Sequence, residues 1–257
     1  MVNLFVFVIG AVVGSFLNVC IYRLPKGQSI VMPPSHCPKC GTRIAWYDNI
    51  PFVSYLLLKG RCRACSQAIS FRYFLVELIA AALITALFLK FGLNERFFAY
   101  SLLTSALIIA TFVDLEIEEI PDEVTISVFA AGIIFSALFP SLFGESVKWR
   151  GLLQSLAGAL AGGGAIYLTG VLGEMVFKKE AMGGGDVKLM AMAGAFLGWE
   201  LVILAFFIAP FFGSITGIIM KIKRGAETIP YGPYLSLAVL IAIFFGERII
   251  GMLFYGV

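Results

Sequence analysis

Long uninterrupted apolar runs are the feature that most constrains this chain. A run of about 20 apolar residues can cross a bilayer as a helix. Of the 257 residues, 60% are hydrophobic and only 14% are charged, whereas a soluble domain has about 45–50% apolar and about 25% charged residues. We therefore predict an all-α polytopic membrane protein. The apolar runs cover residues 2–22, 74–91, 99–113, 124–140, 151–173, 187–200, 201–220 and 234–254.

These runs predict about eight transmembrane helices. The region 187–220 is the least regular, and it fits either two short spans joined near the Gly-Trp-Glu sequence at 198–200 or one longer broken helix. The first run has no basic segment before it, so we expect a retained helix rather than a cleaved signal.

The distribution of basic residues predicts the orientation. The segment 23–73 carries eight Lys and Arg residues and one acid, Asp48, which places it in the cytoplasm by the positive-inside rule and the N-terminus outside. Alternation from there puts fourteen basic residues inside and five outside. We expect three parts: a transmembrane helix at 1–22, a cytoplasmic tetracysteine domain at 23–73 and a seven-helix membrane core at 74–257. The basic residues of the later internal loops are Lys178, Lys179, Lys188, Lys221, Lys223 and Arg224.

The net charge of the chain is small. A formal charge of +3 does not indicate a nucleic-acid partner, whereas the apolar runs require a membrane lipid environment.

Four of the five cysteines form two C-x-x-C pairs in the cytoplasmic segment. They are Cys37, Cys40, Cys62 and Cys65. Thiolates with this spacing can present four sulfurs to one tetrahedral zinc ion, which is then structural because no ligand position stays open. Disulfides or redox thiols are the alternatives, and a cytoplasmic location argues against disulfides. His36 is expected to be a bystander, and the lone Cys20 a small buried apolar residue.

Acidic residues stand at the ends of two apolar runs. In TFVDLEIEEIPDEVT at 111–125, Asp114 ends one run, and Asp122, preceded by proline, opens the next. Asp186 follows three glycines and begins a later run. The predicted topology places these acids on the cytoplasmic side. An acid costs about 2.5–3.5 kcal/mol at the centre of a membrane helix, so acids near such helices are candidates for function.

Each acid also has a structural interpretation. Asp122 has the sequence context of a helix N-cap, and Asp186 fits a cap as well as it fits catalysis. Glu123 suits the first turn of a helix, where the dipole favours an anion. Asp114 ends a helix, where an anion is disfavoured, so a cap does not explain it. The turn acids Glu116, Glu118 and Glu119 are expected to be solvated.

Asp114 and Asp186 together indicate aspartyl-protease chemistry. Two carboxylates that meet at one depth cannot both ionise and share a proton. The ionised group can activate water while the protonated one polarises a peptide carbonyl. Gly183 and Gly185 would let the main chain approach an extended substrate and let the loop move. Lys188 would either tune the local field or contact lipid headgroups.

Several motifs occur in the order found in one enzyme family. They are GSFLNVCIYRLP (14–25), YDNIPFVSYLLLKGRCRAC (47–65), FRYFLVE (71–77), DLEIEEIPD (114–122) and the G-x-G-D at 183–186. With this set the chain resembles the bacterial type IV prepilin peptidases, which are bifunctional leader peptidase/N-methyltransferases among the G-x-G-D membrane aspartyl proteases. The match runs from about residue 10 to about residue 190.

This resemblance implies a function and a site. Such enzymes remove the basic leader of type IV prepilins or type II secretion pseudopilins after a glycine, on the cytoplasmic side of the bacterial inner membrane. They then methylate the new N-terminus with S-adenosylmethionine. The resemblance implies that Asp114 and Asp186 are the catalytic pair, with Asp122 as the alternative to the first. It also assigns the four paired cysteines to the family's metal site.

The methyl-transfer site is the least defined by the sequence. There is no G-x-G-x-x-G motif, so an S-adenosylmethionine site would be built from the cytoplasmic loop and helix ends. Glu77 is a candidate, and an interfacial glutamate whose head reaches water is the alternative. Other classes that fit the composition are an ion-coupled transporter and a zinc-containing membrane assembly factor. The oligomeric state is not predicted.

Overall fold

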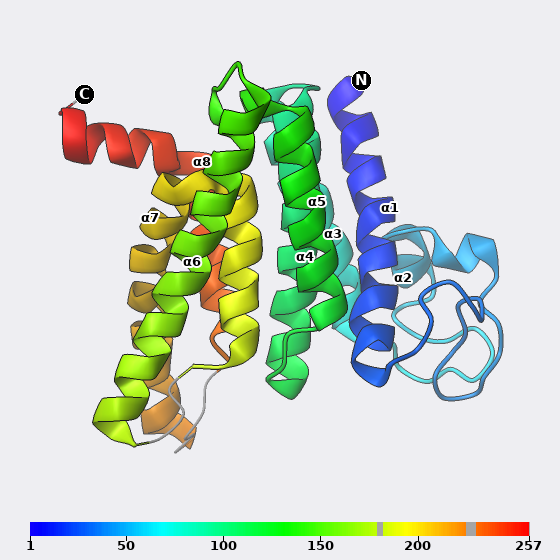
Figure 1. The fold of residues 1–257 in the computed structure, drawn as a ribbon. Helices are drawn as coiled ribbons and strands as arrows, with labels where there is room; N and C mark the ends of the chain where they lie inside the picture. The colour runs from blue at the N-terminus through cyan, green and yellow to red at the C-terminus, as the bar shows by residue number, and fades with distance from the viewer. Residues whose placement is uncertain (179–181, 225–229, 257) are drawn as a thin grey trace. The chain divides into compact units, whose positions relative to one another are not determined.

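The computed structural model describes residues 1–178, 182–224 and 230–256. Lys179, one of the residues predicted inside, lies outside this range. The described residues form helices and loops and contain no strand. Figure 1 shows the order of the elements. The α-helices are α1 (Val2–Arg23), α2 (Val53–Leu57), α3 (Phe71–Phe91), α4 (Glu95–Ile117), α5 (Asp122–Leu138), α6 (Lys148–Phe177), α7 (Gly184–Arg224) and α8 (Gly232–Ile250). Short 3-10 or π turns are η1 (Leu24–Lys26), η2 (Trp46–Asn49), η3 (Pro140–Phe143) and η4 (Gly251–Tyr255).

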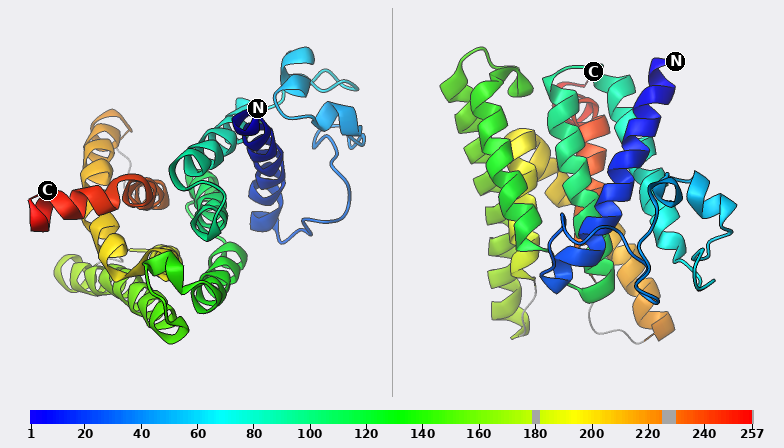
Figure 2. Two further views of the ribbon diagram at one scale, coloured as in Figure 1. Left: turned by 90° about the horizontal axis from the view of Figure 1, so that it is seen from above. Right: turned by 90° about the vertical axis from the view of Figure 1, so that its right-hand side faces the viewer.

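The chain divides into two compact units, Met1–Gly92 and Leu93–Val257. In the first unit, α1 packs against α3 through two glycines one helical turn apart. A Cβ on Gly10 would lie 2.8 Å from the Cα of Ala81, and one on Gly14 would lie 2.7 Å from the Cα of Glu77. Such spacing of small residues lets membrane helices approach closely. Residues between α1 and α3 form the loop-rich lobe beside these helices, drawn in blue and cyan in Figure 2.

The second unit contains a similar contact between α6 and α7. A Cβ added to Gly158 would collide with the carbonyl oxygen of Gly194, and the reverse collision is equally severe. Gly162, four residues further along α6, meets the carbonyl of Met190 in the same way. Main chain therefore lies directly against main chain over one turn of each helix.

Helix α7 is interrupted at Gly198. This residue has φ 76° and ψ 174°, which is outside the helical region. Only glycine adopts such a conformation without steric cost. The chain turns back at this break, and the second half of α7 runs in the opposite direction to the first (Figures 1 and 2). The prediction of a broken segment beside the Gly-Trp-Glu sequence is thus confirmed.

Each predicted apolar run lies largely on a helix. Among the described residues, six helices are long and apolar enough to cross a membrane, namely α1, α3, α4, α6, α7 and α8. Helix α5 has 17 residues, and α7 supplies two of the predicted runs. The prediction of an all-α polytopic protein is confirmed. Helix α4 continues three residues beyond the predicted end at Asp114, to Ile117. Asp114 lies in the last turn of the helix, so its predicted place at a helix end is confirmed.

The glycine contact predicts an effect on stability. Replacing Gly194 with alanine should lower the free energy of unfolding by about 1–3 kcal/mol, the usual cost of overpacking, because backbone has to move. The control is Gly164→Ala on α6, where an added Cβ meets no atom within 4 Å. Thermal unfolding of the purified protein in detergent measures both changes, and equal midpoints for the two variants would contradict the contact.

Candidate active site

Asp114 is buried at the end of α4, with 5% of its surface exposed. Helix α4 ends because Glu118 adopts the left-handed conformation and returns its N–H to the carbonyl of Asp114 at 2.9 Å. This cap turns the chain sharply toward α5. The Asp114 carboxylate accepts a hydrogen bond of 2.8 Å from the main-chain N–H of Gly232, at the start of α8.

Asp186 is buried in the first turn of α7, with 9% of its surface exposed. Its main-chain N–H donates to the carbonyl of Gly183 at 3.1 Å, and its carboxylate accepts from the main-chain N–H of Gly183. The second bond is the one that an acid makes in a capping box, so the cap interpretation of Asp186 describes its local geometry. The first turn of a helix also favours an anion.

Three chain segments converge on the two carboxyl groups. Ile120, in the turn between α4 and α5, lies against the starts of both α7 and α8. A Cβ on Gly185 would be 3.1 Å from the Cβ of Ile120, and one on Gly232 would be 3.3 Å from its Cδ1. The carboxyl groups of Asp114 and Asp186 are close enough to repel each other when both are ionised. Carboxyl groups in this arrangement can share a proton and activate a water molecule.

Tyr231 is the next polar group at this site. Its ring lies against Gly213 in the second half of α7, where an added Cβ would be 2.9 Å from the ring. Burial, with a smaller contribution from the charge of Asp186, raises the pKa of Tyr231 to about 12. The phenol therefore keeps its proton at neutral pH and remains a hydrogen-bond donor.

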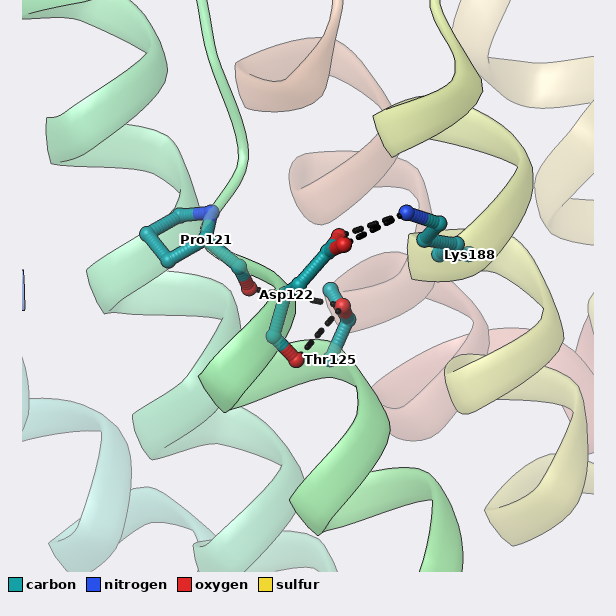
Figure 3. Close-up of polar contacts among 4 residues, drawn as sticks. All are labelled: Pro121, Asp122, Thr125 and Lys188. Atoms are coloured by element: carbon teal, nitrogen blue, oxygen red, sulfur yellow. Dashed lines mark hydrogen bonds and ion pairs between the residues drawn. The ribbon is translucent and has the colours of Figure 1, made fainter. Parts of the chain in front are cut away.

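Asp122 has a different role from the one predicted. Helix α5 begins at Asp122 itself, its N-cap is Pro121, and no side chain caps it, so the prediction of an Asp122 cap was wrong. Figure 3 shows the Asp122 carboxylate instead receiving the Lys188 ammonium, which lies 2.7 Å from each oxygen. Lys188 lies two residues after Asp186 on α7, and its ammonium group reaches Asp122 on α5. Thr125 donates to main-chain carbonyls of the same turn.

The cysteine lobe, residues 24–70 between α1 and α3, contains the same hairpin unit twice. In each unit the main-chain N–H of the first cysteine donates to a carbonyl across a small hairpin. The carbonyl of the same cysteine accepts a hydrogen bond from the N–H of the residue after the second cysteine. The bonds are Cys37 to Thr42 and Gly41 to Cys37, and then Cys62 to Gln67 and Ser66 to Cys62, all at 2.9 Å. Gly41 and Ser66, at equivalent positions, both have positive φ.

The four sulfurs converge on one point. Their positions all lie within 4.8 Å of one another, and the sulfurs of Cys37 and Cys65 are 3.9 Å apart. Hydrogen bonding to Thr42 lowers the pKa of Cys40 to about 6, and the main-chain N–H groups of Cys65 and Ala64 lower that of Cys62. Burial and the neighbouring sulfurs raise the pKa of Cys65 to about 11, because the protons of the group are held by that thiol. Thiolates are the form that binds metals. These residues can therefore hold a metal ion.

The neighbouring sulfur and imidazole groups stay outside this cluster. The His36 ring is 3.1 Å from the carbonyl of Pro34, and Cys20 is buried in α1 with 4% of its surface exposed. Both predictions are confirmed, because neither residue belongs to the four-sulfur group.

Comparison with known families and proteins decides the family. Residues 8–91 match the Bacterial Peptidase A24 N-terminal domain, and residues 101–218 match the Type IV leader peptidase family. Each match lies within one of the two compact units. The chain belongs to the type IV leader peptidase family.

Curated proteins agree with this assignment. A prepilin leader peptidase/N-methyltransferase of Myxococcus xanthus is 40% identical over 86% of this chain and 64% of its own length. A protein of the same name from Pseudomonas aeruginosa is 36% identical over 94% of this chain and 89% of its own length. Another from Neisseria gonorrhoeae is 32% identical over 90% of this chain and 86% of its own length. No solved structure matches the chain significantly. With its apolar helices, this leader peptidase family member is a multi-pass inner-membrane protein.

Glu77 of this leader peptidase family member lies inside the first unit. It is 9% exposed, and its carboxylate accepts a hydrogen bond of 3.0 Å from the N–H of Phe52. Phe52 has φ 62°, a conformation that costs a non-glycine residue free energy. Glu77 therefore stabilises a strained turn, and the alternative that its head reaches water was wrong.

Sequence reasoning missed three residues that the fold brings to the carboxyl pair: Ile120, Tyr231 and Gly232. Ile120 could not be recognised, since its contacts come from segments far along the chain. The other two carry a signal, because PYGPY at 230–234 places a glycine between prolines just before the last apolar run. A glycine at the first position of a helix that also follows a proline-rich turn often marks close main-chain approach.

The Asp122–Lys188 pair predicts a small coupling energy. Its side chains are 54% and 46% exposed, and exposed ion pairs contribute about 0–1 kcal/mol. A double-mutant cycle with Asp122→Asn and Lys188→Met, measured by thermal unfolding in detergent, should give a coupling in that range. A parallel cycle with Glu123→Gln in place of Asp122→Asn should give none. A coupling well above the stated range would mean that the pair is desolvated.

Proposed function

We propose that this chain is a membrane aspartyl endopeptidase that removes the leader from type IV prepilins or type II secretion pseudopilins. We further propose that it methylates the new N-terminus, as the name shared by its relatives indicates. The observation that carries the proposal is the buried pair of carboxyl groups, Asp114 and Asp186, which two helices bring together in a member of this family.

In the proposed reaction, one carboxylate of the pair takes a proton from water as the water oxygen attacks the scissile carbonyl carbon. The protonated partner donates to the carbonyl oxygen, which gives a tetrahedral diol. Return of one proton to the leaving nitrogen breaks the C–N bond and frees an amine and a carboxylic acid, so atoms and charges balance. Either aspartate can begin as the ionised member because the two are coupled.

The substrate would approach along the membrane surface. Positive-inside bias supports a cytoplasmic location for the carboxyl pair and an outside N-terminus. The apolar segment of a prepilin would lie in the bilayer, and its basic leader would be attracted to the acids of the α4–α5 turn, Glu116, Glu118 and Glu119. Gly183 is open enough to let a substrate strand lie beside Asp186, since an added Cβ there meets nothing closer than 3.7 Å.

Gly185 is the more constrained of the two motif glycines. Its contact with Ile120 supports a role in packing the start of α7 against the α4–α5 turn. Lys188, through its ion pair with Asp122, would tie the same two segments together at the surface. These contacts support a scaffold around the pair and favour Asp114 over Asp122 as the partner of Asp186.

Methyl transfer is proposed on the family name alone. S-adenosylmethionine, when bound, supplies the methyl group. Glu77 does not fit a donor site, because its carboxylate is buried and engaged with Phe52. Among the described residues we assign no other side chain to the binding of S-adenosylmethionine.

We propose zinc as the metal of the cysteine lobe. Four ligands at the usual Zn–S distance of about 2.3 Å place neighbouring sulfurs about 3.8 Å apart in a tetrahedron, and the sulfurs of Cys37 and Cys65 are 3.9 Å apart. The site would be structural, because four thiolates leave no position for water. Its binding free energy would stabilise a lobe that has few buried apolar side chains.

The transporter and assembly-factor alternatives are not supported by a specific observation. The two acids lie together at the ends of helices, whereas separate ion paths would place them apart. The test of the carboxyl pair also separates these alternatives, since neither predicts peptide cleavage.

The first prediction from this proposal concerns three aspartates. Asp114→Asn and Asp186→Asn should each lower the rate of prepilin cleavage by about 10²–10⁴-fold, the range for loss of a proton-transfer group. Asp122→Asn is the matched control and should retain most activity, because it loses only an exposed ion pair. Purified variants are incubated with a prepilin and methyl-labelled S-adenosylmethionine, and mass spectrometry reports cleavage and methylation together. Loss of cleavage in Asp122→Asn with retention in Asp114→Asn would reverse the assignment.

The second prediction concerns the metal. Protein purified without chelator should carry about one zinc ion per chain, as expected for a four-thiolate site. Cys62→Ser should lose this zinc and make the lobe sensitive to limited proteolysis. Cys20→Ala, which removes the thiol outside the cluster, should keep it. Elemental analysis measures the metal, and full zinc content in Cys62→Ser would exclude the site.

A further inference from the structure

The start of α8 takes part in the carboxyl site through its main chain. The N–H of Gly232 donates to Oδ2 of Asp114 at 2.8 Å, and both partners are buried. Asp114 lies in the last turn of α4, where the helix dipole disfavours an anion. In the first turn of α8, Pro233 has no N–H, and the N–H groups of the two residues after it bond the carbonyl of Tyr231. Helix α8 therefore presents the Gly232 N–H and the positive end of its dipole to Asp114. Helix α8 thus compensates for the unfavourable position of Asp114 in the last turn of α4.

Position 232 has no space for a side chain. A Cβ there would lie 2.8 Å from Oδ2 and 3.2 Å from Cγ of Asp114, and 3.3 Å from Cδ1 of Ile120. The nearest atom belongs to the carboxylate itself, so an alanine could fit only by moving that carboxylate or the end of α8. Glycine is thus required here for close approach.

Tyr231, the residue before Gly232, is held by packing. Its ring lies against Gly213 and beside the ring of Tyr234, whose centroid is 6.2 Å away. This packing fixes the start of α8, where the Gly232 N–H donates to Asp114.

We propose that Gly232 is a positioning residue of the cleavage reaction, in which its N–H orients the Asp114 carboxylate. This inference rests on the proposed function and deepens it. It assigns to the last helix, which lies beyond the residues matched by the Type IV leader peptidase family, a direct part in assembling the site.

Gly232→Ala tests the proposal. It should lower kcat for prepilin cleavage by about 100-fold, the scale of a displacement of about 1 Å in a catalytic group, with KM nearly unchanged. The matched control is Gly246→Ala on the same helix. A Cβ there also meets a close atom, Leu201 Cδ2 at 2.5 Å, but this is the end of a flexible side chain away from the aspartates. This control should keep kcat within about threefold of wild type, because a packing change without a change at the site leaves turnover intact.

Gly213→Ala provides a second test, because a Cβ there would lie 2.9 Å from the Tyr231 ring and would displace the start of α8 from Asp114. It should lower kcat by about tenfold with KM unchanged, since orientation of a reacting group affects turnover. If Gly232→Ala does not accumulate in the membrane, this variant decides: a wild-type kcat for Gly213→Ala overturns the proposal. Thermal unfolding midpoints in detergent, measured for all variants, separate loss of fold from loss of turnover.

The same experiment distinguishes failure of the inference from failure of the proposed function. Absence of cleavage by the wild-type protein, or normal cleavage by Asp114→Asn, refutes the proposed function itself. Loss of cleavage in Asp114→Asn together with a normal kcat in Gly232→Ala refutes only the inference. An equal loss of kcat in Gly232→Ala and Gly246→Ala also refutes it, since the effect would then be one of helix packing.

Discussion

Close contact between main chains at glycines is the interaction on which the rest of this structure depends. Apolar burial does not drive helices together in a bilayer, because lipid chains are as apolar as leucine; close packing does. Gly158 and Gly194 bring α6 and α7 into such contact in the second unit. Since Asp186 lies eight residues before Gly194 on the same helix, this contact also helps to fix the part of α7 that carries its carboxyl group.

Electrostatic compensation explains how two acids are tolerated at the ends of apolar helices. Asp186 is in the first turn of α7 and receives the N–H of Gly183. Asp114 is in the last turn of α4, so its compensation comes from another helix, through Gly232. The two carboxyl groups are thus supported by the positive ends of two different helices. In both cases a main-chain N–H donates to the carboxylate. The carboxyl groups therefore remain the titrating side chains at the centre of the site.

Local and long-range features differed in how well sequence predicted them. The apolar runs, the C-x-x-C pairs and the break at Gly198 depend on neighbouring residues and could be recognised directly. The partner of Asp122 could not, because Lys188 is 66 residues away in the chain, and an aspartate after proline also has the sequence of a cap. Gly232 is 118 residues from Asp114. The PYGPY pattern marks Gly232 as a position of close approach, but its partner follows from the packing of α4 against α8, which no local pattern specifies.

The repeated hairpin of the cysteine lobe has a consequence for how the lobe is held together. Each hairpin contributes two sulfurs, so neither can complete a four-sulfur site alone. A bound ion would act as a cross-link between residues 40 and 62 and close a loop that includes α2. Its benefit would then be its binding free energy, which is gained only when both hairpins have formed and are held together. Because that loop also contains Phe52, the partner of Glu77, the same cross-link would limit the freedom of the strained turn beside α3.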